Sequence, residues 1–185
     1  MNAHQLTSNA GKQPLAAVGK NPIGTAATGA VGALYLAFRL ADEVYAIEIL
    51  RIREIIEYSK PTAVPMMPPS VRGVINLRGA VVPVIDLSVR FGRNATGVGK
   101  RTCFVIVEVE HAGAMHVLGL MVDGVNAVME IAGDNIEAPP VFGARVDTEF
   151  IVGMARANGR FVIILDMTKV LSIAEMAAVK TVAGE

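Results

Sequence analysis

The sequence lacks tryptophan and has a single cysteine, Cys103, among its 185 residues. One cysteine excludes an internal disulfide, and such sparing use of cysteine is typical of a reducing compartment. Cys103 opens the apolar run Cys103–Val107, where a buried and unreactive thiol is the usual state. Hydrophobic residues make up 52% of the chain, which is enough to bury a sizeable core.

The sequence also lacks net charge, because Lys+Arg and Asp+Glu both number 17. A general nucleic-acid binder usually carries a basic excess, so no nucleic-acid partner is expected. The charges are nevertheless unevenly spread: residues 33–100 are net basic and residues 101–185 are net acidic. Such a split can orient a protein between two partners, although chance scatter of surface charge explains it equally well.

Long hydrophobic runs are missing too. A membrane-spanning helix needs about 18 consecutive apolar residues, and the run Met115–Val122 is already broken at Asp123. Residues 1–5 show no charged-then-apolar signal pattern. These absences predict a cytoplasmic protein without direct membrane insertion.

Catalytic motifs are equally scarce. The loop Asn94–Arg101 resembles a phosphate-binding loop, but Asn94 replaces the first required glycine and Arg101 the required Ser or Thr. A strand rather than a helix is expected after it, so no helix N-terminus is available for a phosphate.

Metal-binding and nucleophilic sites are not indicated either. His111 and His116 flank a turn at a spacing that matches no familiar metal site. Cys103 has no evident activating base. Aspartates that end strands usually bond to turn backbone rather than act in acid–base pairs, and three are found here, Asp86, Asp123 and Asp166. We therefore expect no enzyme activity, cofactor or metal.

The hydrophobic pattern is that of short β-strands separated by turns. Asn158-Gly159 between two apolar runs is the strongest hairpin signal. The pattern predicts about ten strands in two groups of about five, which favours small barrels or a sandwich over alternating β and α units. An internal structural duplication is plausible, without a clear sequence repeat. The expected strands cover residues 34–40, 44–47, 50–56, 71–77, 80–85, 103–109, 115–122, 126–131, 151–157 and 160–166.

The two ends of the chain are expected to differ. Residues 1–32 are poor in large apolar side chains and predict a disordered tail. Ser172-Ile-Ala-Glu175 has the form of a capping box that opens a short C-terminal helix. Residues 33–176 then form the folded domain, and residues 177–185 the end of that helix and a tail.

The segment Gly73–Gly79 contains the best candidate for a binding residue. Arg78 lies in the turn between two apolar strands, so its guanidinium can project from a rigid base and recognise carboxylates. A solvated turn arginine is the simpler alternative. In the strand 50–56, Glu54 shares a face with apolar neighbours, so either that strand bends or Glu54 points into an interface.

Several motifs together resemble the CheW family, the coupling proteins of bacterial chemotaxis. Each motif is weak alone, but their order along residues 33–173 is specific. The matching segments are Tyr45–Ile56, Val64-Pro65, Val71–Gly79, Val82–Leu87, Leu118–Val125, Ile136–Pro140, Ile151–Met154 and Leu165–Leu171.

The resemblance implies a mainly β fold of two SH3-like five-stranded β-barrels packed together, with a short C-terminal helix. A sequential division would place the first barrel at residues 33–97 and the second at 98–171, with edge strands that can exchange between them. It also implies a non-catalytic adaptor that couples chemoreceptors to the histidine kinase CheA, through the kinase's regulatory domain and the receptors' cytoplasmic tips.

In the family, receptor contact is attributed to a groove between the barrels. By motif match, the receptor-binding residues expected here are Ile52, Glu54, Gly73, Asn76, Arg78, Gly79 and Gly119. Glu54 and Arg78 could pair inside the protein, and the glycines serve backbone geometry more readily than contact. A related scaffold of another sensory pathway is the main alternative; a small β-barrel enzyme or carrier would need a deep polar pocket.

Overall fold

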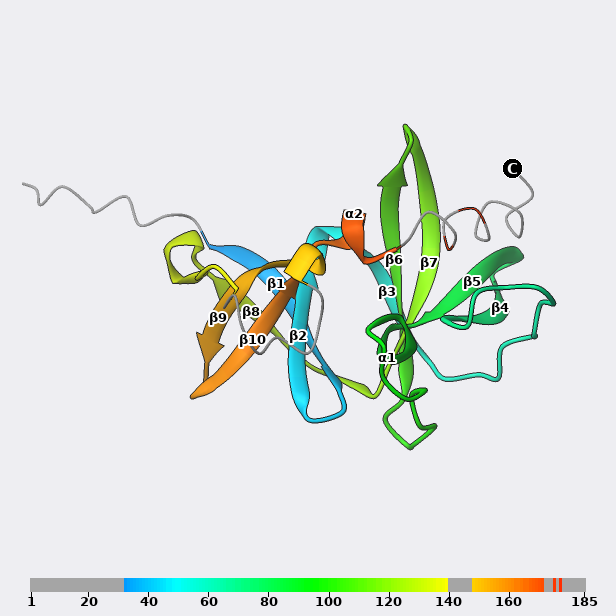
Figure 1. Ribbon diagram of the computed structural model, residues 1–185, viewed down its shortest axis with the longest axis horizontal. Coiled ribbons are helices and arrows are strands. Elements are labelled where there is room, and N and C mark those ends of the chain that lie inside the picture. Colours follow the sequence, from blue (N-terminus) through cyan, green and yellow to red (C-terminus); the bar gives the residue numbers. More distant parts are fainter. Residues whose placement is uncertain (1–31, 140–147, 172–174, 176, 178–185) are drawn as a thin grey trace, which may run out of the picture.

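The computed structural model describes residues 32–139 and 148–171, together with Glu175 and Ala177. Within these residues the chain forms short strands joined by turns and a few short helices (Figure 1). The strands are β1 (Ala33–Leu40), β2 (Glu43–Glu48), β3 (Ile52–Glu57), β4 (Val71–Leu77), β5 (Ala80–Asp86), β6 (Cys103–His111), β7 (Ala114–Val122), β8 (Gly124–Ile131), β9 (Ile151–Ala157) and β10 (Arg160–Leu165). The helices are η1 (Ile49–Arg51), α1 (Leu87–Arg90), η2 (Gly133–Asn135), η3 (Thr148–Phe150) and α2 (Met167–Val170).

The strands form two five-stranded sheets, with the orders β8-β1-β2-β10-β9 and β3-β6-β7-β5-β4. An isolated bridge links the chain beyond one edge strand to the opposite edge strand in each sheet. Glu137, beyond β8, pairs with Met154 of β9, and Thr62, beyond β3, pairs with Val74 of β4. Each sheet thus curls into a small barrel, which removes much of its exposed edge. The expected mainly β fold class is confirmed.

We call the sheet with β1, β2 and β8–β10 the first barrel and the sheet with β3–β7 the second barrel. Their strands do not follow the sequential division near residue 97, because β1 pairs with β8 from Ala33↔Ile131 to Arg39↔Gly124. The exchange therefore involves more than edge strands. Each barrel combines the opening hairpin of one half of the chain with three strands from the other half.

Each barrel contains one copy of an internal repeat. The segments 71–90 and 151–170 align without a gap. Glycine and aspartate occur at equivalent positions in both, as Gly73/Gly153 and Asp86/Asp166. The burial patterns of β4 and β9 are identical. The amides of Asp86 and Asp166 donate to Ser70 O and Phe150 O, each at 2.8 Å. The duplication that seemed plausible from the strand pattern is thus visible in the fold, although few residue types are shared.

Three apolar clusters hold the molecule together. One fills the first barrel, around Tyr35, Ala46 and Ile164. A second fills the second barrel, around Phe104 and Met121. The third and largest joins the barrels and contains Leu36, Phe38, Leu40, Tyr45 and Ile47 from the first and Ile85, Val105, Val107, Leu118 and Leu120 from the second. Because burial of apolar surface is the main driving force of folding, the two barrels form one cooperative unit.

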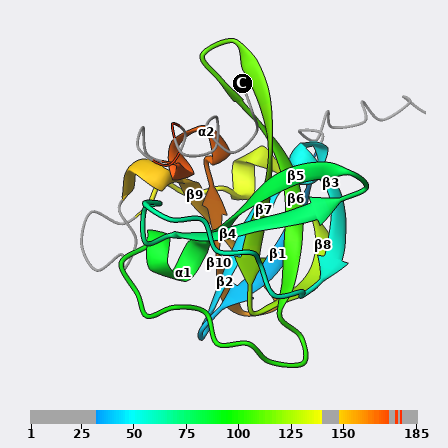
Figure 2. The same cartoon turned by 90° about the vertical axis from the view of Figure 1, so that its right-hand side faces the viewer.

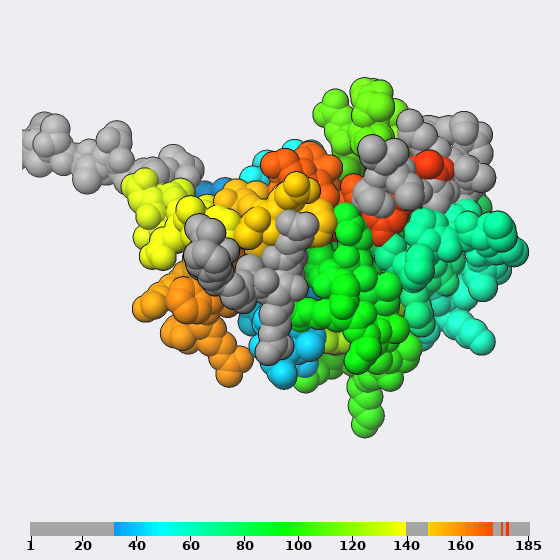
Figure 3. All heavy atoms as spheres, viewed as in Figure 1, coloured from blue at the N-terminus to red at the C-terminus, as the bar shows by residue number. Residues whose placement is uncertain are grey.

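The surface between the barrels is covered on one side by α1 and the loop that follows it. In the space-filling view, green atoms of this region lie between the blue and orange strands of the first barrel and the teal segment of the second (Figure 3). Viewed from the side, α1 lies on the left, while β3 and β8 lie on the right (Figure 2). The interface therefore has an α1 side and a β3 side.

Most expected strands are confirmed to within two or three residues. The strand expected over 50–56 starts later, since residues 49–51 form η1. Two expectations lie outside the described residues. These are the tail, apart from Gly32, and the capping box, apart from Glu175.

Candidate functional site

Glu54 and Arg78 form an ion pair on the second barrel. Glu54 lies on β3 and Arg78 in the turn between β4 and β5, and Arg78 Nη2 lies 2.8 Å from Glu54 Oε2. The Arg78 side chain is 79% exposed, whereas that of Glu54 is 27% exposed. The pair spans from β3 to the hairpin of the opposite edge strand, β4. It leaves most of the guanidinium donors available to a second carboxylate.

A tight turn presents Arg78. Arg78 has φ 53° and Gly79 has φ 90°, and positive φ at both central residues is typical of a type I′ hairpin turn. The Asn76 side-chain oxygen accepts a hydrogen bond of 2.9 Å from the Gly79 amide. Gly79 meets the requirement of the second position without strain, while Arg78 adopts a conformation that a branched residue would resist.

Ile52 and Glu54 lie on either side of an irregularity near the start of β3. The register of β3 on β6 shifts between Ile52 and Glu54, which marks a β-bulge. Ile52 is half-buried and packs against the core between the barrels. The strand therefore bends where Glu54 would otherwise continue the apolar face, and Ile52 lies at the edge of the interface.

Gly73 is required by the closure of the second barrel. Its φ is 129°, and a Cβ on it would lie 2.1 Å from the carbonyl oxygen of Thr62. Thr62 bonds to Val74 through both backbone groups, at 2.8 Å and 2.9 Å. Gly73 thus allows two backbones to approach closely and is buried away from any partner.

Gly119 lies in the middle of β7 and is also buried. A Cβ on it would lie 3.5 Å from Ile106 and from Val84, which is ordinary van der Waals contact. Since Ile106 and Val84 belong to the core of the second barrel, Gly119 faces that interior. Neither buried glycine can touch a partner directly, whereas Arg78, Gly79 and Asn76 share one exposed turn.

Two exposed apolar residues beside the predicted ones were not expected. Leu50 in η1 is 89% exposed, and Ile55 on β3 is 45% exposed. Both flank Ile52 in sequence, and Ile55 pairs with Val105 of the core between the barrels. Strict alternation from residue 50 puts Leu50 on the inner face with Ile52, so η1 hides the exposure of Leu50. Ile55 shares the parity of Arg53, and both are exposed on β3. We call Leu50, Ile52, Glu54, Ile55 and Arg78 the β3 surface.

Asp86 has a structural role. It is fully buried, caps α1 through the amides of Ser88 and Val89, and accepts bonds of 2.9 Å and 2.8 Å from the amide and hydroxyl of Thr96. Its carboxylate thereby anchors the loop 93–101 that resembled a phosphate loop. These four bonds occupy both of its oxygens, so the carboxylate is not free for acid–base chemistry.

Asp166 and Cys103 are two further chemical candidates from the sequence. Burial raises the pKa of Asp166, but the bonds from the Thr168 hydroxyl and amide and the charge of Lys169 outweigh it, so the net pKa is lowered. Burial raises the pKa of the Cys103 thiol, against a smaller lowering by the Val125 backbone. Such a thiol is a poor nucleophile at neutral pH.

Among the described residues, no group of three or more His, Cys, Asp and Glu side chains is placed to hold a metal ion. The part of the chain that the structure describes also contains no helix long and apolar enough to cross a membrane.

Comparisons with known proteins agree on one family. The family model described as "CheW-like domain" matches residues 34–175. The Chemotaxis protein CheW of Klebsiella aerogenes is 35% identical over 153 residues, which cover 83% of this chain and 90% of that protein. The Chemotaxis protein CheW of Rhizobium meliloti is 31% identical, covering 77% of this chain and 90% of that protein.

A solved structure agrees with the fold. The crystal structure of the scaffolding protein TtCheW from Thermoanaerobacter tengcongensis matches with a TM-score of 0.69 at 33% sequence identity. The match covers 78% of this chain and 95% of that one.

Proposed function

This chain belongs to the CheW-like domain family and is a non-catalytic chemotaxis adaptor, and we propose that it joins chemoreceptor cytoplasmic tips to the regulatory domain of the histidine kinase CheA. An adaptor of this kind adds no chemistry. It couples its partners because it binds both at once and with different affinity in different signalling states.

The observation that carries the receptor assignment is the Glu54–Arg78 pair. One guanidinium nitrogen lies 2.8 Å from Glu54, while the side chain stays 79% exposed on a rigid turn. The ion pair restricts the arginine to one direction without burying it. A guanidinium held in this way is suited to a carboxylate of a partner, since planar forked donors recognise carboxylates in a fixed geometry.

The β3 surface adds apolar contact to this charge. Leu50 and Ile55 are exposed, and Ile52 is half-buried at the edge of the interface between the barrels. A helical receptor tip with an apolar stripe would bury these side chains, as amphipathic helices do in hydrophobic grooves. Arg78 and Glu54 would then fix its orientation and register.

Gly73, Gly79, Gly119 and Asn76 support this surface without forming it. Asn76 and Gly79 shape the turn, Gly73 closes the barrel behind it, and Gly119 lies in the interior. The protein is expected to act in the cytoplasm and to be recruited to membrane-associated receptor arrays through its partners.

A pull-down with receptor cytoplasmic tips and, separately, with the kinase regulatory domain tests this proposal. The wild-type chain should capture both, and Arg78→Ala should lose most of the receptor while it keeps the kinase domain. Arg72→Ala is the matched control, because Arg72 is an exposed arginine on β4 of the same barrel. If the wild-type chain captured neither partner, the proposal would be wrong.

A further inference from the structure

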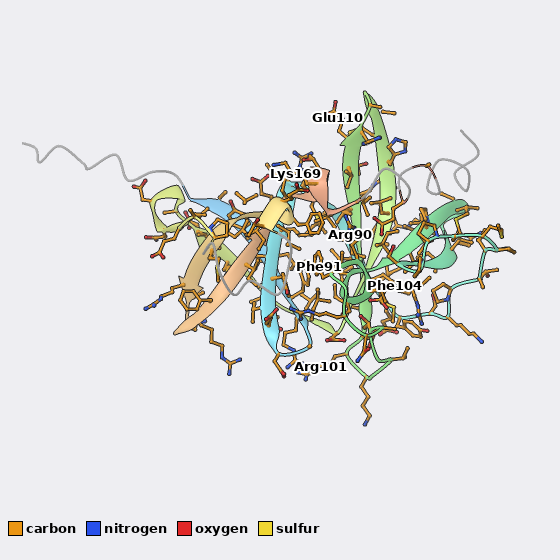
Figure 4. The ribbon with its side chains drawn as sticks, viewed as in Figure 1. Arg90, Phe91, Arg101, Phe104, Glu110 and Lys169 are labelled. Atoms are coloured by element: carbon orange, nitrogen blue, oxygen red, sulfur yellow. The ribbon has the colours of Figure 1, made fainter. Side chains whose placement is uncertain are left out.

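Two arginines connect the barrels on the α1 side of the interface. Arg90 ends α1 and Arg93 follows it, and both side chains are only 17% exposed. Arg90 lies beside Phe91 between the two barrels (Figure 4). Both arginines belong to the segment after β5 of the second barrel, and both bond to segments of the first.

Arg90 reaches the chain around β9 and β10. Its Nε donates to the Val170 carbonyl oxygen at 2.5 Å, and its guanidinium carbon lies 4.4 Å from the centre of the Phe150 ring. Val170 is the residue of the second repeat that corresponds to Arg90, so the bond joins the ends of the two equivalent helices.

Arg90 is also paired with a buried carboxylate. Its Nε lies 2.9 Å from Glu175 Oε2, and the Glu175 side chain is 4% exposed. The other oxygen of Glu175 accepts a hydrogen bond from the hydroxyl of Ser70, next to β4. Charges in such surroundings are stable only when paired, so this contact admits little displacement.

Arg93 reaches the β1–β2 hairpin. Its Nη2 donates to the Tyr45 hydroxyl at 2.9 Å and pairs with Glu43, and its Nη1 lies 3.5 Å from the Leu40 carbonyl oxygen. The Tyr45 hydroxyl donates to Glu43 at 2.6 Å. Burial and this bond raise the pKa of Tyr45, so the hydroxyl keeps its proton.

The apolar interface alone does not define an orientation well. Apolar contact is non-directional, and hydrophobic packing tolerates small rearrangements at modest cost. Phe91 stacks between Tyr45 and Phe150 of the first barrel, at 5.6 Å and 6.0 Å, and such stacked rings can slide. The directional contacts are those of the arginines on either side of Phe91.

We propose that Arg90 and Arg93 are positioning residues that hold the two barrels in one relative orientation, and thereby set the shape of the β3 surface where the receptor tip binds. They act from the α1 side, opposite β3 and β8 (Figure 2). Ile52, at the edge of the interface on the β3 side, moves with any rocking of one barrel against the other. The receptor consequence rests on the proposed function; the orientation itself does not.

Double variants that replace both residues of an arginine–glutamate pair test this role of Arg90 and Arg93. We call the two pairs, Arg90–Glu175 and Arg93–Glu43, the arginine clamp. Arg90→Met with Glu175→Gln removes both charges of that pair, and the amide oxygen can still accept from Ser70. Arg93→Met with Glu43→Gln does the same beside Tyr45. The matched control is Arg53→Met with Glu108→Gln, because that pair, at 3.4 Å, joins β3 to β6 within one barrel.

The readout is the distance between spin labels on the two barrels, measured by double electron–electron resonance. The labels are attached at Arg72→Cys on β4 and Arg160→Cys on β10, both exposed, in a Cys103→Ser background. The wild-type and control chains should give one narrow distance distribution. The chain with both arginine pairs removed should give a broader one, while circular dichroism shows the strands intact.

Receptor-tip affinity, measured without labels, is the second readout. It should fall about tenfold in the chain with both pairs removed, which is a typical coupling between linked sites. It should stay unchanged in Arg72→Ala, which serves as the control for this readout because Arg53 lies between Ile52 and Glu54 of the β3 surface. An unchanged distance distribution would overturn the clamp. A broader distribution with unchanged receptor affinity would overturn its link to the β3 surface. If the wild-type chain fails to bind receptor tips, the proposed function fails and the distance result still decides the clamp.

Discussion

At the residue scale, the Glu54–Arg78 pair contributes direction more than stability. Exposed ion pairs contribute about 0–1 kcal/mol, because solvent screens the charges and the side chains lose entropy. The Arg78 side chain is 79% exposed. The ion pair matters for binding, because Glu54 and the type I′ turn together restrict the direction of the Arg78 guanidinium.

Arg78→Ala should therefore separate binding from stability. We expect the free energy of unfolding to change by less than about 1 kcal/mol, while capture of receptor tips falls. Thermal melting followed by circular dichroism measures the first quantity and pull-down the second. Substantial unfolding of Arg78→Ala would show that Arg78 is mainly structural.

The two buried glycines of the predicted site should respond in opposite ways to alanine. Gly73→Ala places a Cβ 2.1 Å from a backbone oxygen at φ 129°, so it should destabilise the protein by about 3 kcal/mol. Gly119→Ala meets side chains at 3.5 Å and the Pro83 carbonyl oxygen at 3.7 Å, all at ordinary van der Waals distance, so it should be neutral or stabilise by about 0.5 kcal/mol.

Urea denaturation of both glycine variants measures this difference. Equal destabilisation by the two substitutions would contradict the distinction between backbone approach at Gly73 and open packing at Gly119. Loss of receptor capture by a stable Gly119→Ala chain would show that the interior of the second barrel influences binding.

The sequence allowed part of this site to be predicted. Arg78 and Glu54 were identifiable because each breaks a local pattern, one at a turn and one on an apolar strand face. Leu50 was not, since η1 interrupts the strand alternation at that position. Ile55 was not either, because an outward-facing isoleucine on a strand does not by itself indicate a binding surface. The burial of Gly119 depends on Val84 and Ile106, from two other strands.

At the scale of elements, the two repeats close their barrels in the same way, at Gly73 and Gly153, but differ in the turn residue that follows. Gly153 corresponds to Gly73, and a Cβ on it would lie 2.4 Å from Ile136 Cγ2 and 2.7 Å from the Glu137 carbonyl oxygen. Arg78 corresponds to Asn158, so the first barrel lacks the charged turn. The two repeats thus share the glycine that allows close backbone contact, but only one of them has the arginine in its turn.

Gly153→Ala should accordingly destabilise the chain although its φ is not positive, by about 2 kcal/mol, because Glu137 and Ile136 must shift. Receptor capture by the folded fraction should persist, since the affected bridge lies in the first barrel. Urea denaturation checks the stability, and a neutral effect would show that the Ile136–Glu137 segment moves freely.

The cap of α2 predicts an acid-dependent contribution. The pKa of Asp166 is lowered in the folded protein from its ordinary value of 3.8. Its stabilising contribution is therefore present above pH 3.8 and is lost as the pH falls through the lower folded-state pKa. Asp166→Asn should be less stable than wild type at neutral pH, and the difference should shrink in acid. Melting across this pH range would contradict the account if the difference stayed constant.

Hairpins were predictable at this scale, whereas barrel membership was not. The turns at Arg78-Gly79 and Asn158-Gly159 each combine a first residue at positive φ with glycine, which is a local signal. The pairing of β1 with β8 joins residues about a hundred positions apart, and no local pattern specifies it. The sequential division at residue 97 allowed only edge strands to exchange, and it underestimated the exchange for that reason.

At the scale of the whole molecule, the exchange ties both halves of the chain into both barrels. The buried side chains of the core between the barrels come from eight of the ten described strands, namely β1, β2, β4–β7, β9 and β10, so neither barrel is an independent unit. An adaptor built in this way can transmit a displacement from one bound partner to another, because the barrels share a core and the arginine contacts.

One molecule of this protein should bind a receptor tip and the kinase regulatory domain at the same time. Sedimentation velocity of the chain mixed with both partners tests this most directly. A chain that bridges the two partners should form a ternary species, which Arg78→Ala should reduce to the complex with the kinase domain alone. Mutual displacement of the two partners, with no ternary species at saturating concentrations, would contradict it.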